Sequence, residues 1–293
     1  MAVPSIEIAS LTKSYPPRGR APGLVALSDV NLLVKMGEFV AVLGPSGCGK
    51  STLLHIVGGL VPASGAVLVQ GHKIEGPGLD RGIVFQDYAL FPWRTVIENV
   101  EFGLEIKKLP KAERRAIARR NIAAVGLAGF ENRYPAQLSG GMKQRVAIAR
   151  ALAFDPEVLL MDEPFAALDA QTREILQAEL LRIWEETGKT VIFITHSIDE
   201  AVFLAQRVVV ITARPGRIKA IVDVELPEPR YGRDVRSTAE FVAVRRALWE
   251  LLAEEVDKTT AEAFAPREVQ EPVRQPRQGF FASLSRSFAR GTA

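Results

Sequence analysis

The most informative run of residues follows an apolar segment, Phe39 to Leu43, at the start of an expected helix. The run matches G-x-x-x-x-G-K-[ST] and reads Gly44-Pro45-Ser46-Gly47-Cys48-Gly49-Lys50-Ser51-Thr52. Glycines let the backbone turn tightly, so successive N–H groups can surround a phosphate at the positive end of a helix. In that arrangement Lys50 reaches the β- and γ-phosphate oxygens of a nucleotide, and Ser51 ligates Mg²⁺. A plain glycine-rich turn is the alternative interpretation.

Two adjacent acids stand at the end of a second apolar segment, Val158 to Met161. At the carboxyl end of a strand, Asp162 can hold Mg²⁺ through water, and Glu163 can accept a proton from water that attacks the γ-phosphate. An Asp-Glu pair at a strand end is also typical of a solvated turn. The glycine loop upstream favours the catalytic interpretation.

A second candidate anion site lies in Leu138 to Arg145, which reads LSGGMKQR. Ser139 is a good N-cap, and Gly140 and Gly141 expose backbone N–H groups at the positive end of the helix dipole. Taken alone, this pattern is also typical of an ordinary helix cap. Because the first glycine loop already covers one nucleotide, this helix end must serve a different ligand or a nucleotide held by another subunit.

With these motifs in this order, the sequence resembles the ATP-binding subunits of ABC transporters over about residues 5 to 225. The resemblance implies a head-to-tail dimer with two ATP molecules in the interface, in which the Ser139 helix closes over the ATP of the opposite copy. It also implies that Tyr15 stacks on adenine and that Gln86 contacts Mg²⁺ and the attacking water. By the same resemblance Asp169 lies in the D-loop, and His196 holds the γ-phosphate.

Several of these assignments have alternatives in the sequence itself. Tyr15 precedes the irregular stretch Pro16 to Pro22 and could be a surface tyrosine, while Gln86 could cap a strand. Ala166 stands in the D-loop where many relatives carry Ser or Gly, which indicates an altered contact across the dimer. Cys48 lies near a helix N-terminus that favours the thiolate, although a small residue that merely fits the loop is the simpler interpretation.

The order of elements, together with the resemblance, predicts an α/β fold of the P-loop NTPase type. Its parts are a mixed and mostly parallel sheet, an N-terminal antiparallel β subdomain, and an inserted helical subdomain at about 87–154. The expected domains are 5–226, a helical extension at 227–266, and a basic, flexible tail at 267–293. Expected strands are 6–9, 30–34, 39–43, 66–69, 158–161, 191–195, 208–212 and 218–224; expected helices are 51–58, 110–128, 139–153, 170–187 and 237–256.

Two turns carry more specific expectations. Arg214-Pro215-Gly216-Arg217 should be a type II turn that joins a hairpin, because Pro followed by Gly suits its central positions. Ser237 to Glu240 has the spacing of a capping box in front of the last helix.

Charge and composition exclude several classes of protein. The chain has 293 residues, 47% of them hydrophobic, and one cysteine, which is typical of a globular protein without disulfides. Five of the 37 basic and two of the 34 acidic residues lie in 267–293, which leaves 32 of each and no basic face for nucleic acid. Neither a bilayer-spanning apolar run nor a secretory signal is apparent, so we expect a protein of the cytosol.

The aromatic run Asp87 to Val96 either packs against the helical subdomain or forms a groove for a helix of a membrane partner. Residues 90–100, 199–205 and 213–218 resemble the nitrate, sulfonate and taurine importer branch. That resemblance implies two copies of this subunit, two membrane permease subunits and an external solute-binding protein, at the cytoplasmic face of the cell membrane. Another importer, an exporter, a soluble ABC ATPase and a docking module without turnover remain alternatives. In the tail, Phe281, Leu284 and Phe288 share one helical face, which favours an amphipathic helix that binds lipid or the permease. Disorder of the tail is the alternative interpretation.

Overall fold

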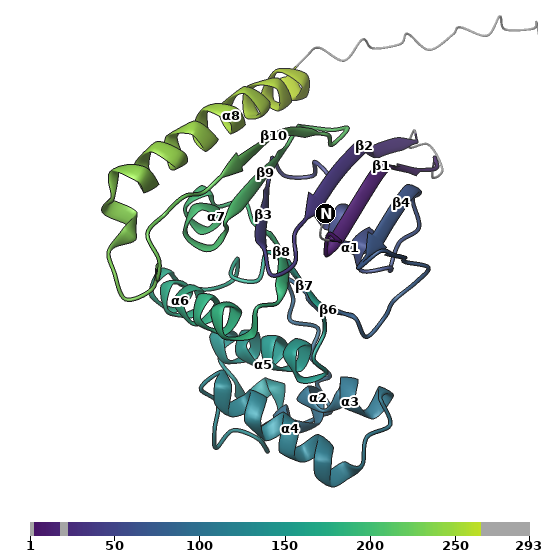
Figure 1. The fold of residues 1–293 in the computed structure, drawn as a ribbon, viewed down its shortest axis with the longest axis vertical. Coiled ribbons are helices and arrows are strands. Elements are labelled where there is room, and N and C mark those ends of the chain that lie inside the picture. Colours follow the sequence, from purple (N-terminus) through teal and green to yellow (C-terminus); the bar gives the residue numbers. More distant parts are fainter. Residues whose placement is uncertain (1–2, 18–22, 265–293) are drawn as a thin grey trace, which may run out of the picture.

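The computed structural model describes residues 3–17 and 23–264, with side chains through Glu255 (Figure 1). In this part of the chain the central sheet has six strands in the order β10-β9-β3-β8-β7-β6. Strands β9, β3, β8, β7 and β6 run parallel, and β10 is antiparallel to β9. The strands are β3 (Phe39–Leu43), β6 (Arg81–Val84), β7 (Val158–Asp162), β8 (Thr190–Ile194), β9 (Arg207–Ile211) and β10 (Ile218–Asp223).

Both faces of the central sheet are covered, as the continuous apolar segments predict. Along β3, Val40 and Val42 pack into the core shared with the N-terminal sheet and α1 (Lys50–Val57). The intervening Phe39 and Ala41 pack into the core on the opposite side, with the helices. The period of two along a strand thus divides the residues of β3 between two separate cores.

The N-terminal sheet is antiparallel and has the order β2-β1-β4-β5. Its strands are β1 (Ile6–Tyr15), β2 (Leu24–Val34), β4 (Ser64–Val69) and β5 (His72–Lys73). Strands β1 and β2 are longer than the sequence predicts, because their pairing continues through register shifts between Ile8 and Ser14. These irregularities hide the apolar alternation that a strand would otherwise show.

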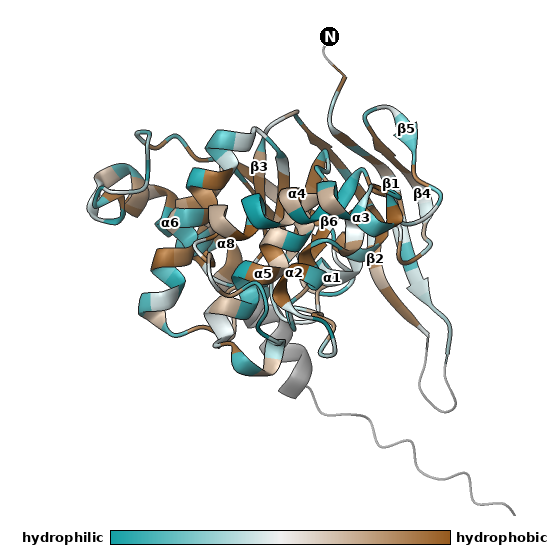
Figure 2. Cartoon of the chain, turned by 90° about the horizontal axis from the view of Figure 1, so that it is seen from below, coloured by the Kyte–Doolittle hydropathy of each residue, from teal (hydrophilic) through white to brown (hydrophobic). Residues whose placement is uncertain are grey.

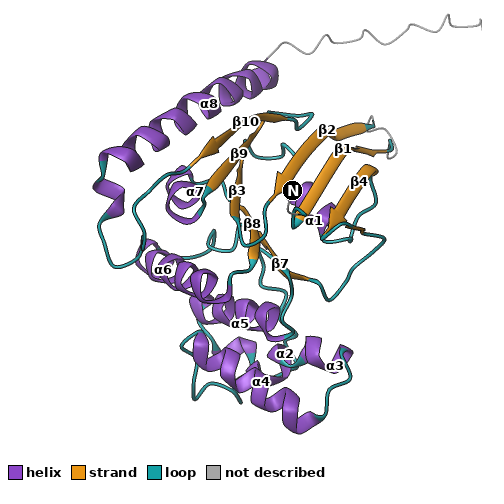
Figure 3. Ribbon diagram, viewed as in Figure 1, coloured by secondary structure: helices purple, strands orange, loops and turns teal. Residues whose placement is uncertain are grey.

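Helix α6 (Ala170–Thr187) joins the neighbouring parallel strands β7 and β8, which confirms the predicted βαβ unit. Helix α7 (Ile198–Leu204) follows β8 and is capped by Ser197, whose hydroxyl accepts a hydrogen bond from Glu200 N. Helices α6 and α7 lie on the side of the central sheet away from the N-terminal sheet (Figure 3).

The helical region consists of α2 (Val96–Val100), α3 (Phe102–Ile106), α4 (Lys111–Ala124), the 3₁₀ turn η1 (Pro135–Gln137) and α5 (Gly140–Ala153). It lies at one end of the molecule, and its helices carry both hydrophilic and hydrophobic stretches (Figures 1 and 2). Helix α4 ends earlier than predicted, because Gly126 takes a φ of 69° that a right-handed helix cannot accommodate.

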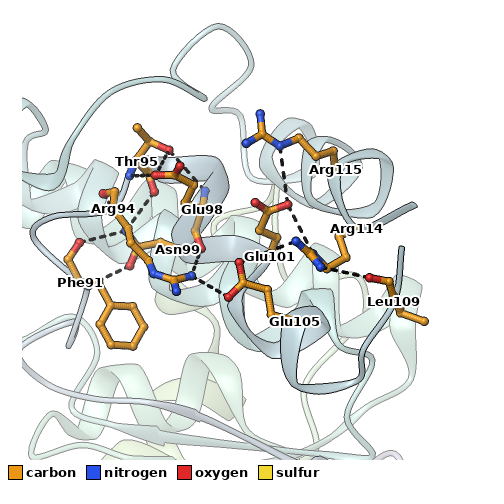
Figure 4. Close-up of polar contacts among 10 residues, drawn as sticks. All are labelled: Phe91, Arg94, Thr95, Glu98, Asn99, Glu101, Glu105, Leu109, Arg114 and Arg115. Atoms are coloured by element: carbon orange, nitrogen blue, oxygen red, sulfur yellow. Dashed lines mark hydrogen bonds and ion pairs between the residues drawn. The ribbon is translucent and has the colours of Figure 1, made fainter. Parts of the chain in front are cut away.

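A polar cluster orders the start of this region (Figure 4). Asn99 is fully buried, and its amide bonds the backbone of Phe91 at N (2.8 Å) and O (3.2 Å) and the carbonyl of Arg94 (3.0 Å). The buried carboxylate of Glu101 lies 3.7 Å from Arg115 Nε and 3.9 Å from Arg114 Nε. The hydrogen bonds of Asn99 therefore hold the aromatic loop that precedes α2 in place.

At the C-terminal side, the 3₁₀ turn η2 (Val235–Ser237) precedes α8 (Ala239–Phe264), which extends beyond the predicted end at Val256. Thr238, rather than Ser237, accepts the capping hydrogen bond from Phe241 N. Helix α8 runs along the outer side of β10 (Figure 1). Among the described residues, no helix combines the length and the apolar character needed to cross a bilayer. The expectations for the tail fall outside the described residues.

The β9–β10 hairpin is present, but the prediction of a type II turn is wrong. The Arg214–Pro215 peptide is cis, and Gly216 lacks the positive φ that the third residue of a type II turn requires. Instead, Gly216 bonds to β2: Gly216 N donates to Ala26 O (2.9 Å), and Ser28 N donates to Gly216 O (3.0 Å). Contacts distant in the sequence therefore determine the form of this turn.

Candidate nucleotide-binding and hydrolysis site

The glycine loop connects β3 to α1, with Gly49 at the N-cap position of the helix. Gly49 has a φ of 107°, and a β-carbon there would lie 2.8 Å from Leu27 Cδ2 and 2.9 Å from Ala26 O. A larger residue is excluded by both conformation and space. The glycine thus allows the loop to curl against β2 and leaves the first N–H groups of α1 at the mouth of the loop.

Lys50 is buried, and its ammonium group points back over the loop. Its Nζ donates hydrogen bonds to Gly44 O at 2.8 Å and to Pro45 O at 3.0 Å. These contacts hold a positive charge inside the loop, where a phosphate would be bound.

Ser51 and Asp162 come together from elements more than a hundred residues apart. Ser51 Oγ, on the first turn of α1, donates a 3.0 Å hydrogen bond to Asp162 Oδ1 at the end of β7. A hydroxyl beside a carboxylate forms a set of hard oxygen atoms, which is the chemistry that Mg²⁺ prefers. The residues present therefore fit the metal that the sequence implies.

Burial raises the pKa of Asp162 above its usual value. The hydrogen bond from Ser51 and the nearby charges of His55 and Lys50 oppose this shift, whereas Glu163 adds to it. His55 Nε2 lies 4.0 Å from Asp162 Oδ2. The carboxylate is consequently held in a place where an added cation would favour its ionised form.

Glu163 and His196 form a second pair at the adjoining ends of β7 and β8. His196 Nδ1 lies 3.2 Å from Glu163 Oε2, which is a hydrogen-bonding distance. The backbone of Glu163 has a φ of 43°, which is unfavourable for a residue with a β-carbon, and its N–H donates to Ile194 O at 3.0 Å. The chain thus holds the carboxylate in a defined position at the edge of the sheet.

A pocket of ≈ 290 Å³ adjoins the glycine loop. Tyr15 lies at the end of β1 and is 37% exposed, and the ammonium of Lys13 is 4.9 Å from its ring centroid. The lining residues are Tyr15, Leu24, Ala26, Ser46, Gly47, Gly49, Lys50, Ser51, Thr52, Glu163 and Arg214. The lining therefore combines aromatic and apolar residues of β1 and β2 with the phosphate-binding backbone of the glycine loop.

Other predicted site residues lie apart from this pocket in the described part of the chain. Gln86 follows β6 and is exposed. Ser139 caps α5 by accepting a hydrogen bond from Met142 N at 3.3 Å, with Gly140 exposed and Gly141 buried behind it. Asp169 caps α6 by accepting from Thr172 N at 2.9 Å, and this hydrogen bond lowers its pKa. None of these residues is among those that line the pocket beside the glycine loop.

The expectation that the helix favours the thiolate of Cys48 is wrong. The side chain is 1% exposed, and burial raises the pKa of the thiol even though Lys50 acts in the opposite direction. A β-carbon at Gly44 would lie 2.8 Å from Cys48 Sγ, so the cysteine is tightly packed within the loop. Cys48 is present as a small residue that fits, which was the alternative interpretation.

Sequence reasoning missed two polar residues at the site. His55 stands four residues after Ser51, a spacing that places both on one helical face, so the sequence contained a usable signal. Arg214 donates to Gly47 O from Nε at 3.2 Å and from Nη2 at 2.9 Å. The sequence indicated only a hairpin at Arg214, because the two residues are far apart along the chain.

The fold and the site define a P-loop nucleotide hydrolase, and comparison with known proteins narrows the class. A family model described as "ABC transporter" matches residues 27–166. An uncharacterized ABC transporter ATP-binding protein of Methanocaldococcus jannaschii is 57% identical over 255 residues, which cover 87% of this chain and 93% of the relative. The chain belongs to the ABC transporter ATP-binding proteins and is an ABC ATPase.

Relatives with more specific names are also similar. The taurine import ATP-binding protein TauB of Escherichia coli is 48% identical over 228 residues, covering 76% of this chain and 89% of that protein. TauB of Pelagibacter ubique is 50% identical over 229 residues, covering 76% and 86%. A solved ATP-binding cassette, dimeric and bound to ADP and Pi after hydrolysis, is 38% identical with a TM-score of 0.67, covering 75% of this chain and 99% of the cassette.

Proposed function

We propose that this chain is the ATP-hydrolysing subunit of a transporter that imports a small organic or inorganic anion of the taurine, aliphatic sulfonate or nitrate type. Support for the solute class comes from the relatives named for taurine import, at 48% and 50% identity. Residues 5–226 would form the ATPase unit, with the segment at about 87–154 inserted in it and 227–266 as a helical extension.

The observation that carries hydrolysis is the contact between Glu163 and His196 at 3.2 Å, beside the glycine loop. Glu163 would accept the proton of the attacking water, and His196, 61% exposed at its side chain, would orient Glu163 and contact the γ-phosphate. Lys50 and the backbone of Gly44 to Thr52 would bind the phosphates, and Tyr15 would stack on adenine.

Mg²⁺, when bound, would neutralise charge that develops on the phosphate oxygens. Ser51 would ligate it directly, Asp162 would hold it through water, and Gln86 would approach from β6. The 3.0 Å contact between Ser51 and Asp162 supports the first two assignments. For Gln86, the support is its position after a parallel strand that neighbours β7.

We further propose that two copies enclose two ATP molecules head to tail. Ser139 and Gly140 are exposed at the N-terminus of α5, with Gly141 buried behind them, and none of the three lines the pocket of its own chain, which suits a role toward the nucleotide of the other copy. Asp169 would lie in the same interface. The dimeric cassette bound to ADP and Pi is the similar protein that supports this assembly.

The partner in the membrane would bind the aromatic loop before α2. Phe91 packs on Phe102 at a centroid distance of 4.7 Å, whereas Trp93 is 72% exposed. The packed part of the loop agrees with the first sequence interpretation, and the outward-facing Trp93 supports a docking role for the rest. We propose that two permease subunits dock here, at the cytoplasmic face of the membrane, and that an external binding protein delivers the solute to them.

Co-purification with the permease subunits, followed by ATPase assays in lipid vesicles, tests the proposal. Turnover that rises when a taurine-, sulfonate- or nitrate-loaded binding protein is added would support it. Stimulation only by a different solute would indicate another importer, and solute movement in the opposite direction would indicate an exporter. ATP hydrolysis by a protein that never associates with a permease would favour a non-transport ABC ATPase.

A further inference from the structure

The turn between β9 and β10 holds the glycine loop by its backbone. The guanidinium of Arg214 donates two hydrogen bonds to the carbonyl oxygen of Gly47, at 3.2 Å from Nε and 2.9 Å from Nη2. Gly47 has a φ of 74°, a conformation that most residues disfavour. A cation on its carbonyl oxygen fixes the orientation of the peptide between Gly47 and Cys48, in the middle of the phosphate-binding segment.

The turn lies directly on the loop rather than reaching it from a distance. A β-carbon at Gly216 would lie 2.2 Å from Cys48 O, so only glycine allows this approach. The two hydrogen bonds between Gly216 and β2 hold the turn from the other side. Arg214 is thus presented to Gly47 by a backbone that is itself held at a second point.

A third support comes from the C-terminal helix. Glu255, on α8, is 1% exposed, and its Oε2 accepts a 2.9 Å hydrogen bond from Ala213 N, the residue before Arg214. Lys219 Nζ lies 2.9 Å from Glu255 Oε1. A charged acceptor makes a stronger hydrogen bond than a neutral one does, so this contact ties α8 to the residue from which Arg214 extends.

We infer that Arg214 is a positioning residue of the nucleotide site and that Glu255 sets its position, so that α8 controls the affinity of the glycine loop for nucleotide. Arg214 keeps the Gly47 carbonyl turned outward, which keeps the loop in the form that binds phosphate before nucleotide arrives. Without Arg214, the loop would have to become ordered when nucleotide binds. The free-energy cost of this ordering would weaken the binding of ATP and ADP equally. The inference rests on the glycine loop being the nucleotide site.

Binding of ATP and ADP is measured by calorimetry, with steady-state hydrolysis alongside. Arg214→Ala should raise both dissociation constants by about three- to fivefold, because the charge-assisted hydrogen bonds of Arg214 are exposed and water weakens them. It should raise KM by a similar factor while changing kcat by less than about twofold. Arg214→Lys, which keeps the charge and one donor, should recover part of the affinity. Arg217→Ala is the matched control, since Arg217 is exposed in the same turn and uses its backbone for both of its hydrogen bonds with Thr212.

A double-mutant cycle tests the role of α8. Glu255→Gln should weaken nucleotide binding by a few-fold, and the Arg214→Ala, Glu255→Gln variant should bind no more weakly than Arg214→Ala alone. Glu254→Gln is the control, because Glu254 contacts Lys219 from the same helix, whereas Ala213 N donates to Glu255. Thermal unfolding checks that each variant is folded. If Glu255→Gln does not fold, Arg214→Lys still tests the role assigned to Arg214.

Unchanged affinity in Arg214→Ala would overturn the inference. Additive effects in the cycle would overturn the part assigned to Glu255. If the unsubstituted protein bound neither nucleotide, the proposed function itself would fail, which is a separate result.

Discussion

Replacing Asp162 by Asn removes a charge from a side chain that is only 8% exposed, while keeping its size and an oxygen that can accept from Ser51 Oγ. Because burial raises the pKa of Asp162, the folded state holds its proton more tightly than the unfolded state does. The free energy of unfolding therefore falls as the pH rises from the ordinary value for Asp, about 3.9, through the raised value. Above both values the ionised side chain opposes folding.

Asp162→Asn should consequently stabilise the protein without nucleotide at pH 7–8. We expect a gain on the order of 1 kcal/mol, a typical size for single substitutions, and hence a Tm about 2–4 °C higher. The gain should shrink as the pH falls and disappear at about pH 3 and below, where Asp162 is mostly protonated in both states.

With nucleotide and Mg²⁺ the order should reverse. A ligand at a hundred times its Kd stabilises the folded state by about 2.7 kcal/mol. Loss of a group that holds a metal through its outer shell typically weakens metal binding by about 10- to 100-fold. The same ligand concentration would then stabilise the variant by only about 0.4 to 1.4 kcal/mol.

Thermal unfolding with and without ATP and Mg²⁺, over about pH 3–8, measures both effects. Asp223→Asn is the control, because Asp223 is an exposed residue at the end of β10. An Asp162→Asn variant less stable than the parent without nucleotide at pH 7 would refute the electrostatic argument. An undiminished response to ATP and Mg²⁺ would refute the placement of Asp162 at the metal.

Three further predictions concern neighbouring parts of the site. Glu163→Gln should bind ATP but release phosphate about 10²- to 10⁴-fold more slowly, and turnover equal to that of the parent would exclude Glu163 as the base. Gly141→Ala should lower the Tm, because the added β-carbon would lie 2.8 Å from Thr172 Cγ2. Gly140→Ala should leave the Tm unchanged, because the nearest atom to the added β-carbon is at 3.4 Å. Equal Tm values for the two variants would contradict this packing. Cys48 should react with iodoacetamide far more slowly in the folded protein at pH 7.5 than after unfolding, by mass spectrometry, and fast labelling of the folded form would contradict its burial.

The parts of the site that are local in sequence were predictable. Residues 44–52 combine a strand end, glycines and a helix start in one segment, so their chemistry and their conformation follow from the same few residues. Asp162 and Glu163 were predictable for a similar reason, because an apolar strand delivers whatever follows it to the edge of the sheet. The sequence also indicated the βαβ unit of β7, α6 and β8, which depends on short-range order.

Contacts between distant segments were not predictable in the same way. The Arg214 turn owes its form to hydrogen bonds with Ala26 and Ser28 on β2, and residue preferences alone suggested the wrong turn. The thiol of Cys48 responds to burial by neighbours from several elements, which outweighs the helix end beside it. In each case the deciding interaction joins residues that no local pattern connects.

The ammonium group of Lys50 is already satisfied by the carbonyl oxygens of Gly44 and Pro45. An incoming molecule must outcompete these two internal acceptors, and a neutral sugar or base has no charge with which to do so. The loop would therefore discriminate against adenosine and other uncharged metabolites that share the purine ring. Selectivity against nucleosides would thus come from the hydrogen bonds of Lys50 in the unliganded protein, and it would act at the binding step, before catalysis.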